Sequence, residues 1–361
     1  EMRALIFCLA LCCLPVRVYS EVAQWRLVQR VPLAPAGARF GAAFHGRDSL
    51  TVFAWGHKLF LWESSDGHWR TVAEFPGGLG AGCAGDPDQD GRPDLALLQS
   101  NPRGDNWPGQ LVWLQAPSYA PSVVTSEEEF ADCILVALDG VPGVLVVHKF
   151  GQLRFYSQPH SPQSVYRELY SFYSSSRQGG LLEAEVDDDG HLDLTCGNYW
   201  LQNPARAGRP WRLYAINLWS EAPDSAVLTM AAEADERGRL RGLFAAQRRV
   251  NSARLARFVK PEDPRRLWEE QHLGLGLTLR GVAALAWLRP ASGPGWLILA
   301  EAARQACRLF AARAPDFRPT LLDTSAGYLG VWELPAGEKG VLRFAALSRR
   351  DLTVWEFQPR K

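Results

Sequence analysis

The stretch Leu59-Phe60-Leu61-Trp62-Glu63 decides the architecture, because the chain repeats this pattern of a short apolar strand that ends in a large apolar residue and a polar one. Six further copies follow at Leu111–Gln115, Leu153–Ser157, Asn198–Gln202, Ala256–Lys260, Cys307–Ala311 and Leu352–Glu356. Their mean spacing is about 49 residues, and periods of roughly 40 to 50 residues are typical of propeller blades. The sequence therefore contains seven repeats of one structural unit.

Each repeat contains about four β-rich segments. A further strand precedes each copy, as at Asp94–Ser100, and several copies are followed by a strand such as Trp69–Val72. Gly- and Ala-rich segments, such as Arg39–His45 and Gly281–Leu288, begin the units. Four strands per unit is the composition of a propeller blade. We therefore predict an all-β fold, a seven-bladed β-propeller of four-stranded blades.

The two ends of the chain complement each other. The seventh repeat stops at Phe357, after its third strand, whereas Trp25–Val31 has the pattern of a fourth strand. We expect this N-terminal strand to complete the last blade, which protects strand edges that would otherwise promote aggregation. The alternative architecture, independent β-sandwich domains, would not predict that the N-terminal segment supplies the strand that the last repeat lacks.

The first twenty residues differ from the rest. Arg3 precedes an apolar run from Ala4 to Val16, and the small Ser20 follows, which is the pattern of a secretory signal peptide. The run is shorter than the about 20 residues that span a bilayer. We expect residues 1–20 to be a signal peptide and residues 21–361 to form one propeller domain that is secreted or periplasmic, monomeric and without a transmembrane segment.

Charge and cysteine content exclude some classes of protein. The chain has 39 basic and 39 acidic residues, so its overall electrostatics do not favour nucleic acid as a partner. Outside the signal peptide lie Cys83, Cys133, Cys196 and Cys307, far apart and without C-x-x-C spacing, which gives no support to a zinc site. We expect buried free thiols, with one disulfide left open.

One loop has the composition of a cation site. In Asp86-Pro87-Asp88-Gln89-Asp90-Gly91-Arg92-Pro93-Asp94, carboxylates stand at loop positions one, three, five and nine, and Gly stands at six. Ca²⁺ takes six to eight oxygen ligands, and the Gly permits the sharp turn that directs alternate side chains inward. The predicted ligands are Asp86, Asp88, Asp90, the Arg92 carbonyl and Asp94. An EF-hand is excluded, because Leu97 stands where that loop needs a Glu.

A second copy of the loop lies in the fourth repeat. Its predicted ligands are Glu185, Asp187, Asp189, the His191 carbonyl and Asp193, and Glu in the first position predicts a weaker or rearranged site. A third trace runs from Glu233 to Gly238, but Arg237 stands in place of a ligand, and a guanidinium has no lone pair to offer a metal. We expect that third loop to hold no cation.

These loops resemble the FG-GAP/VCBS-type repeats of bacterial secreted propellers and, more distantly, the head of the integrin α-subunit. The resemblance implies that Ca²⁺ sits in the D-x-D-x-D-G-x-x-D loop between the first two strands of a blade. We expect the ion to be structural in both predicted sites, because it neutralises the carboxylates and fixes the loop.

Functional motifs of enzymes are missing from the sequence: we find no G-x-S-x-G elbow, no H-E-x-x-H and no phosphate-binding loop. We therefore expect a non-catalytic binding or scaffolding module with a protein or carbohydrate ligand. The alternative is a polysaccharide-active hydrolase or lyase with a carboxylate pair or a calcium-assisted base at the channel mouth. Adhesion to a protein in the integrin manner is a third possibility and predicts an exposed apolar patch on one rim.

Overall fold

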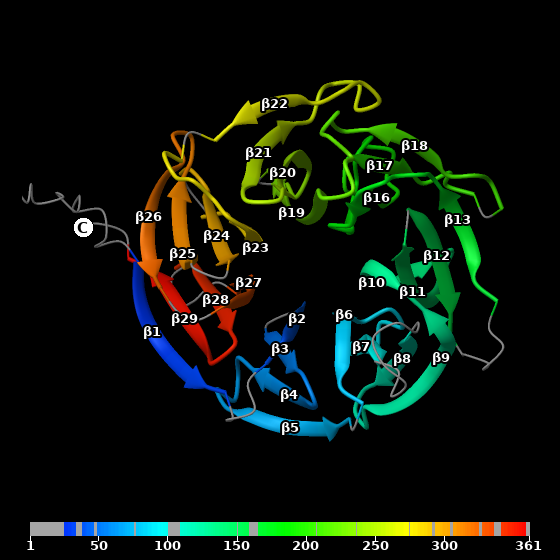
Figure 1. Cartoon of the computed structure of the whole chain (residues 1–361), viewed down its shortest axis with the longest axis horizontal. Helices are drawn as coiled ribbons and strands as arrows, with labels where there is room; N and C mark the ends of the chain where they lie inside the picture. The colour runs from blue at the N-terminus through cyan, green and yellow to red at the C-terminus, as the bar shows by residue number, and fades with distance from the viewer. Residues whose placement is uncertain are drawn as a thin grey trace, which may run out of the picture.

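The computed structural model describes residues 25–33, 38–46, 49–75, 77–99, 109–149, 151–158, 165–206, 208–235, 237–273, 275–290, 293–303, 306–324, 327–335 and 341–358. Within these ranges every regular element is a β-strand, and the strands form seven sheets arranged in a ring (Figure 1). The predicted seven-bladed β-propeller is confirmed.

The blades follow one another along the chain, with the first strand of each blade nearest the centre of the ring (Figure 1). Blade 1 comprises β2 (Phe40–His45), β3 (Leu50–Trp55), β4 (Lys58–Glu63) and β5 (Trp69–Glu74). Blade 2 comprises β6 (Leu79–Gly85), β7 (Asp94–Gln99), β8 (Gly109–Gln115) and β9 (Ala120–Glu128). Blade 3 comprises β10 (Phe130–Leu138), β11 (Val141–His148), β12 (Gln152–Ser157) and β13 (Arg167–Ser171).

Blade 4 has shorter strands, β15 (Leu182–Ala184), β16 (Asp193–Cys196), β17 (Tyr199–Gln202) and β18 (Arg212–Ala215). Blade 5 comprises β19 (Ala226–Ala234), β20 (Leu240–Arg248), β21 (Ala253–Val259) and β22 (Glu269–His272). Blade 6 comprises β23 (Val282–Leu288), β24 (Trp296–Ala303), β25 (Ala306–Arg313) and β26 (Arg318–Asp323). Blade 7 comprises β27 (Tyr328–Leu334), β28 (Arg343–Ser348), β29 (Asp351–Phe357) and β1 (Trp25–Pro32).

Blade 5 departs from the predicted pattern. The two-residue strand β14 (Arg177–Gln178), from the connection between blades 3 and 4, pairs in parallel with β19 and gives this sheet a fifth strand. Gln178 is buried, its side-chain Nε2 donates to the Ser176 hydroxyl, and its Oε1 accepts from the Asn198 amide. These bonds tie the connection to blade 4, while its pairing with β19 joins it to blade 5.

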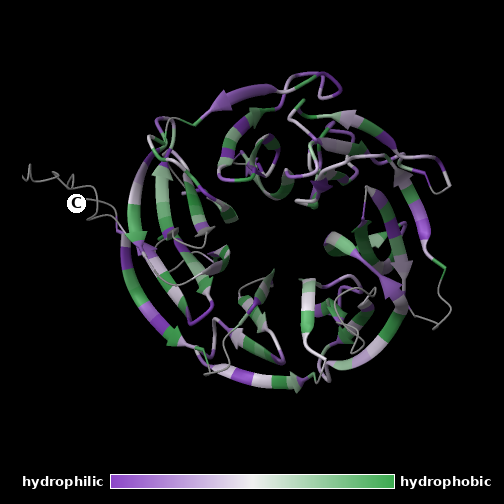
Figure 2. Ribbon diagram, viewed as in Figure 1, coloured by the Kyte–Doolittle hydropathy of each residue, from purple (hydrophilic) through white to green (hydrophobic). Residues whose placement is uncertain are grey.

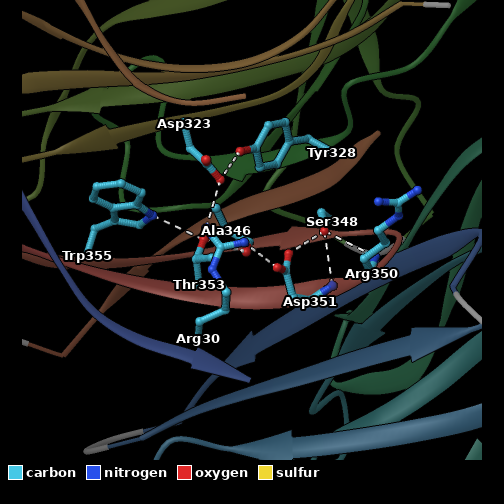
Figure 3. Close-up of polar contacts among 9 residues, drawn as sticks. All are labelled: Arg30, Asp323, Tyr328, Ala346, Ser348, Arg350, Asp351, Thr353 and Trp355. Atoms are coloured by element: carbon cyan, nitrogen blue, oxygen red, sulfur yellow. Dashed lines mark hydrogen bonds and ion pairs between the residues drawn. The ribbon is translucent and has the colours of Figure 1, made fainter. Parts of the chain in front are cut away.

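The N-terminal strand closes the ring, as predicted. β1 pairs antiparallel with β29, with Trp25 opposite Phe357 and Val31 opposite Leu352. Around this seam, Arg30 contacts the carboxylates of Asp351 and Asp323 (Figure 3). Blade 7 therefore combines segments from both ends of the described chain.

The core consists of seven clusters of buried apolar side chains, one at each interface between neighbouring blades. Trp55, Trp62, Trp113 and Trp200 are among the largest fully buried side chains. Outer strands such as β1 and β5 carry both hydrophobic and hydrophilic residues (Figure 2), as strands with one solvated face do. Packing between blades therefore holds the ring together.

Indole groups add polar ties between blades. Trp55 Nε1 in blade 1 donates to the Gly80 carbonyl of blade 2 at 2.8 Å, and Trp200 Nε1 in blade 4 donates to the Pro264 carbonyl of blade 5 at 3.1 Å. Each bond satisfies a buried donor that would otherwise cost free energy. These bonds fix how the neighbouring sheets are placed relative to each other.

The predicted signal peptide, residues 1–20, lies outside the described residues. In the part of the chain that the structure describes, no helix has the length and apolar character needed to cross a membrane.

Candidate metal centre

Both acidic loops connect the first and second strands of a blade, as predicted. The first loop joins β6 to β7 in blade 2, and the second joins β15 to β16 in blade 4. Antiparallel pairing of Gly85 with Asp94, and of Ala184 with Asp193, marks the base of the two loops. The two loops thus occupy equivalent places in their repeats.

The two loops also share a backbone conformation. Position four has a positive φ in both, 58° at Gln89 and 59° at Asp188. Position six is Gly in both, with φ of 83° at Gly91 and 86° at Gly190. A Cβ at either glycine would meet nothing within 4 Å, so the requirement for Gly is conformational and not steric. The sequence similarity therefore reflects one common turn.

The first loop brings three carboxylates together. One oxygen each from Asp86, Asp88 and Asp90 lies within 4.8 Å of the others. The loop amides orient them: Asp86 accepts from the Gly91 N–H at 2.9 Å, and Asp90 accepts from the Arg92 N–H at 2.8 Å. Three anionic oxygens held this close are hard ligands of the kind that Ca²⁺ selects.

The carboxylate at position nine lies deeper in both repeats. Asp94 is buried and accepts from Trp113 Nε1 at 2.9 Å and from the Ala116 N–H at 2.8 Å. Asp193 is buried and accepts from the Val186 and Asn203 amides at 3.1 and 2.7 Å. These bonds anchor each loop to its blade. Asp94 therefore lies apart from the group formed by Asp86, Asp88 and Asp90.

Burial raises the pKa of Asp94 to about 6 and that of Asp193 to about 7. Bonds from the Ala116 and Asn203 amides oppose the shift, and nearby loop carboxylates add to it. A divalent cation in the loop would favour the ionised forms of both groups.

The second loop contains an unsatisfied buried oxygen. Glu185 accepts from the Gly190 N–H at 2.6 Å, and Asp189 accepts from the His191 N–H at 2.9 Å, which repeats the bonding of the first loop. Asp187 Oδ1 is buried and has no hydrogen-bond partner among the described residues. Burying an unpaired polar atom is costly, and a bound cation would remove that cost. The residues of the second loop therefore fit a metal ion.

Each acidic loop accepts a hydrogen bond from a glutamine that we did not predict from the sequence. Gln115 Nε2 donates to Asp88 Oδ2 at 3.2 Å, and Gln202 Nε2 donates to Asp187 Oδ2 at 2.5 Å. Both glutamines are the polar residue that ends the third-strand pattern of their repeat. The sequence did contain a signal for these glutamines, because the two repeats with an acidic loop both have Gln at this position.

Lys260 is a further residue that the sequence pattern did not indicate. Its ammonium group, from the end of β21 in blade 5, donates to the Val186 carbonyl at 2.8 Å and pairs with Asp188 at 2.9 Å. The Lys260 side chain is only 10% exposed. A fixed positive charge thus lies beside the second loop, and the first loop has no counterpart among the ion pairs of the described residues.

The third acidic trace is neutralised by arginine. Asp235 Oδ2 lies 3.2 Å from Arg239 Nε and 2.6 Å from Arg241. The Arg237 N–H donates to Asp235 Oδ1 at 2.8 Å. Arginine thus supplies the positive charge at this loop.

No protein-family model matches the sequence, and it has no significant match among curated proteins. Solved structures do match. The α-L-arabinanase of Penicillium chrysogenum, complexed with arabinobiose, has a TM-score of 0.52 at 12% identity, over 91% of this chain and 98% of that chain. The β-propeller domain of Cps50 (Swd1) from Myceliophteria thermophila has a TM-score of 0.56 at 12% identity, over 92% and 100%. The common feature is the fold alone.

Proposed function

We propose that this chain is a secreted or periplasmic calcium-binding propeller of the FG-GAP/VCBS type that acts as a non-catalytic binding or scaffolding module. The observation that supports this proposal is the equivalence of the two acidic loops in position, backbone conformation and hydrogen bonding. Two repeats that preserve the same carboxylate-bearing turn favour a common ligand over two unrelated solvated loops.

The proposed role of Ca²⁺ is structural. In the first loop the ion would take oxygens from Asp86, Asp88, Asp90 and the Arg92 carbonyl, with Asp94 supporting the loop from the strand side. In the second loop it would take Glu185, Asp187, Asp189 and the His191 carbonyl, with Asp193 in the supporting place. An ion that binds only the folded state stabilises it by mass action.

The two proposed sites differ in expected affinity. The first loop has three converging carboxylates, whereas the corresponding three side chains of the second loop do not form such a group. The second loop also has Lys260 beside it. We therefore propose that the first loop binds Ca²⁺ more tightly, and that the second is filled only at higher calcium concentration.

A chelator experiment tests the calcium part of the proposal. We expect the melting temperature of the full chain to fall when EGTA replaces calcium, and Asp88→Ala to reproduce much of that fall. Asp66→Ala is the matched control, because Asp66 is an exposed aspartate in the turn between β4 and β5. A melting curve that EGTA leaves unchanged would count against both sites.

The proposed ligand is a protein or a carbohydrate, and the test is a glycan and protein panel scored for retention and for product release. Retention without product supports a binding module. The alternative, a polysaccharide-active hydrolase or lyase, predicts product, and its acid would need a raised pKa. Burial raises the pKa of Asp132 on β10 to about 6 and that of Glu333 on β27 to about 7, so Asp132→Asn and Glu333→Gln are the variants to score for loss of product.

A further inference from the structure

Two cysteines face each other at the interface of blades 2 and 3. Cys83 lies on β6 and Cys133 on β10, the innermost strands of the two blades, and their Sγ atoms are 2.7 Å apart. The two residues are 50 positions apart in the sequence. A disulfide bond is about 2.05 Å long. A displacement of less than an ångström would therefore bring the sulfurs to bonding distance.

The neighbouring residues explain why the strands come so close. Gly85 follows Cys83 by two residues, and Leu135 follows Cys133 by two, so each pair lies on one face of its strand. A Cβ at Gly85 would lie 2.8 Å from the Leu135 Cβ and 3.1 Å from its carbonyl oxygen. The absence of a side chain at Gly85 thus permits the close approach that sets the two cysteines opposite each other.

The sulfurs are enclosed in an apolar cluster. Cys83 is 8% and Cys133 is 3% exposed, and both belong to the cluster around Trp113 and Val146. Burial raises the pKa of the Cys133 thiol, so the folded protein offers little thiolate for exchange. A bond at this place would form during folding and would then be sheltered from reductants.

We propose that Cys83 and Cys133 form a structural disulfide that joins blade 2 to blade 3. When it forms, both S–H bonds break, one S–S bond forms and two protons pass to solvent. The two electrons reduce an oxidant of the disulfide class, such as a thiol–disulfide oxidoreductase, whose S–S bond takes up two protons from solvent and becomes two thiols. An oxidising compartment, which the predicted signal peptide implies, supplies such oxidants.

A thiol map of the full chain tests this proposal. The chain is produced in a bacterial periplasm, denatured with excess N-ethylmaleimide and digested before and after reduction. We expect label on Cys196 and Cys307, and one cross-linked species that contains Cys83 and Cys133 and separates on reduction. Label on all four cysteines before reduction, or a cross-link between any other pair, would overturn the proposal.

Thermal unfolding supplies an independent readout. Because the folded chain shelters the bond, the wild-type chain is unfolded, reduced and refolded in reductant. This treatment is expected to lower its melting temperature by roughly 5–10 °C, because the bond restricts a long loop of the unfolded state. The double variant Cys83→Ala/Cys133→Ala should show no effect of reductant, whereas Cys196→Ala should keep it. A wild-type melting temperature that reductant does not change would contradict the proposal even if the double variant fails to fold.

Discussion

Arg30 and Asp351 form an ion pair between the first and the last strands of the described chain (Figure 3). The same guanidinium lies 3.3 Å from Asp323, at the end of β26 in blade 6. The Ser348 hydroxyl donates to Asp351 Oδ1 at 2.6 Å and orients that carboxylate. One side chain of the N-terminal strand therefore contacts two blades at the seam of the ring.

The seam should depend more on apolar packing than on this ion pair. Trp25 is 6% exposed and packs edge-on against Trp296 and Phe344. Trp25→Ala is expected to lower the free energy of unfolding by about 3–5 kcal/mol, whereas Arg30→Ala should cost less than about 1 kcal/mol because Arg30 is 40% exposed.

Urea denaturation of the two variants checks this order. Arg26→Ala is the matched control, because Arg26 lies on the same strand but is exposed. If Trp25→Ala were as stable as the control, the ring would not depend on the N-terminal strand for closure.

Lys260 provides a way to tune the second loop alone. Its positive charge beside Asp188 should oppose a cation in that loop. Lys260→Met, in an Asp88→Ala background that disables the first loop, is expected to increase the calcium affinity several-fold. Calorimetric titration of calcium measures the change, with Lys58→Met as the control because Lys58 pairs with Glu74 in blade 1. If Lys260→Met did not change the calcium affinity of the Asp88→Ala variant, Lys260 would have no effect on cation binding in the second loop.

Glu333 should make stability depend on pH. It lies partly buried on β27, and burial raises its pKa from the ordinary 4.5 to about 7. Between these values the unfolded chain releases a proton that the folded chain keeps, so stability falls as pH rises from 4.5 to about 7 and levels off above.

The variant Glu333→Gln removes this contribution. The difference in unfolding free energy between wild type and variant should change by on the order of 2 kcal/mol across the window. Denaturation of both proteins at pH 5 and pH 7.5 measures this change. Groups other than Glu333 titrate in both proteins, so their contributions cancel when the two free energies are subtracted. A constant difference, or one of opposite sign, would show that the Glu333 carboxyl ionises as readily in the folded chain as in the unfolded one.

The sequence was sufficient to predict the ring because its signals are periodic. Seven third-strand copies and the offset between Trp25 and Phe357 define blade number and closure, and apolar alternation within the strands sets which face is buried. The strand β14 was not predictable, because a two-residue segment has no period and its pairing depends on where blade 5 lies in space.

The candidate site was predictable only in part. Loop composition located Asp86, Asp88 and Asp90, and the structure brings these three together. The depth of Asp94 and Asp193 follows from contacts with neighbouring strands and not from loop spacing. Lys260 reaches the second loop from 72 residues away in the next blade, a distance over which no local pattern carries information.

A crystal structure of the full chain at saturating calcium, with anomalous diffraction data, is the most direct test of calcium binding. The account predicts anomalous density in the first loop, about 2.3–2.6 Å from oxygens of Asp86, Asp88 and Asp90. The same position should be empty in Asp88→Ala crystals grown in parallel. Well-ordered carboxylates around a water molecule, without anomalous density at saturating calcium, would contradict the account.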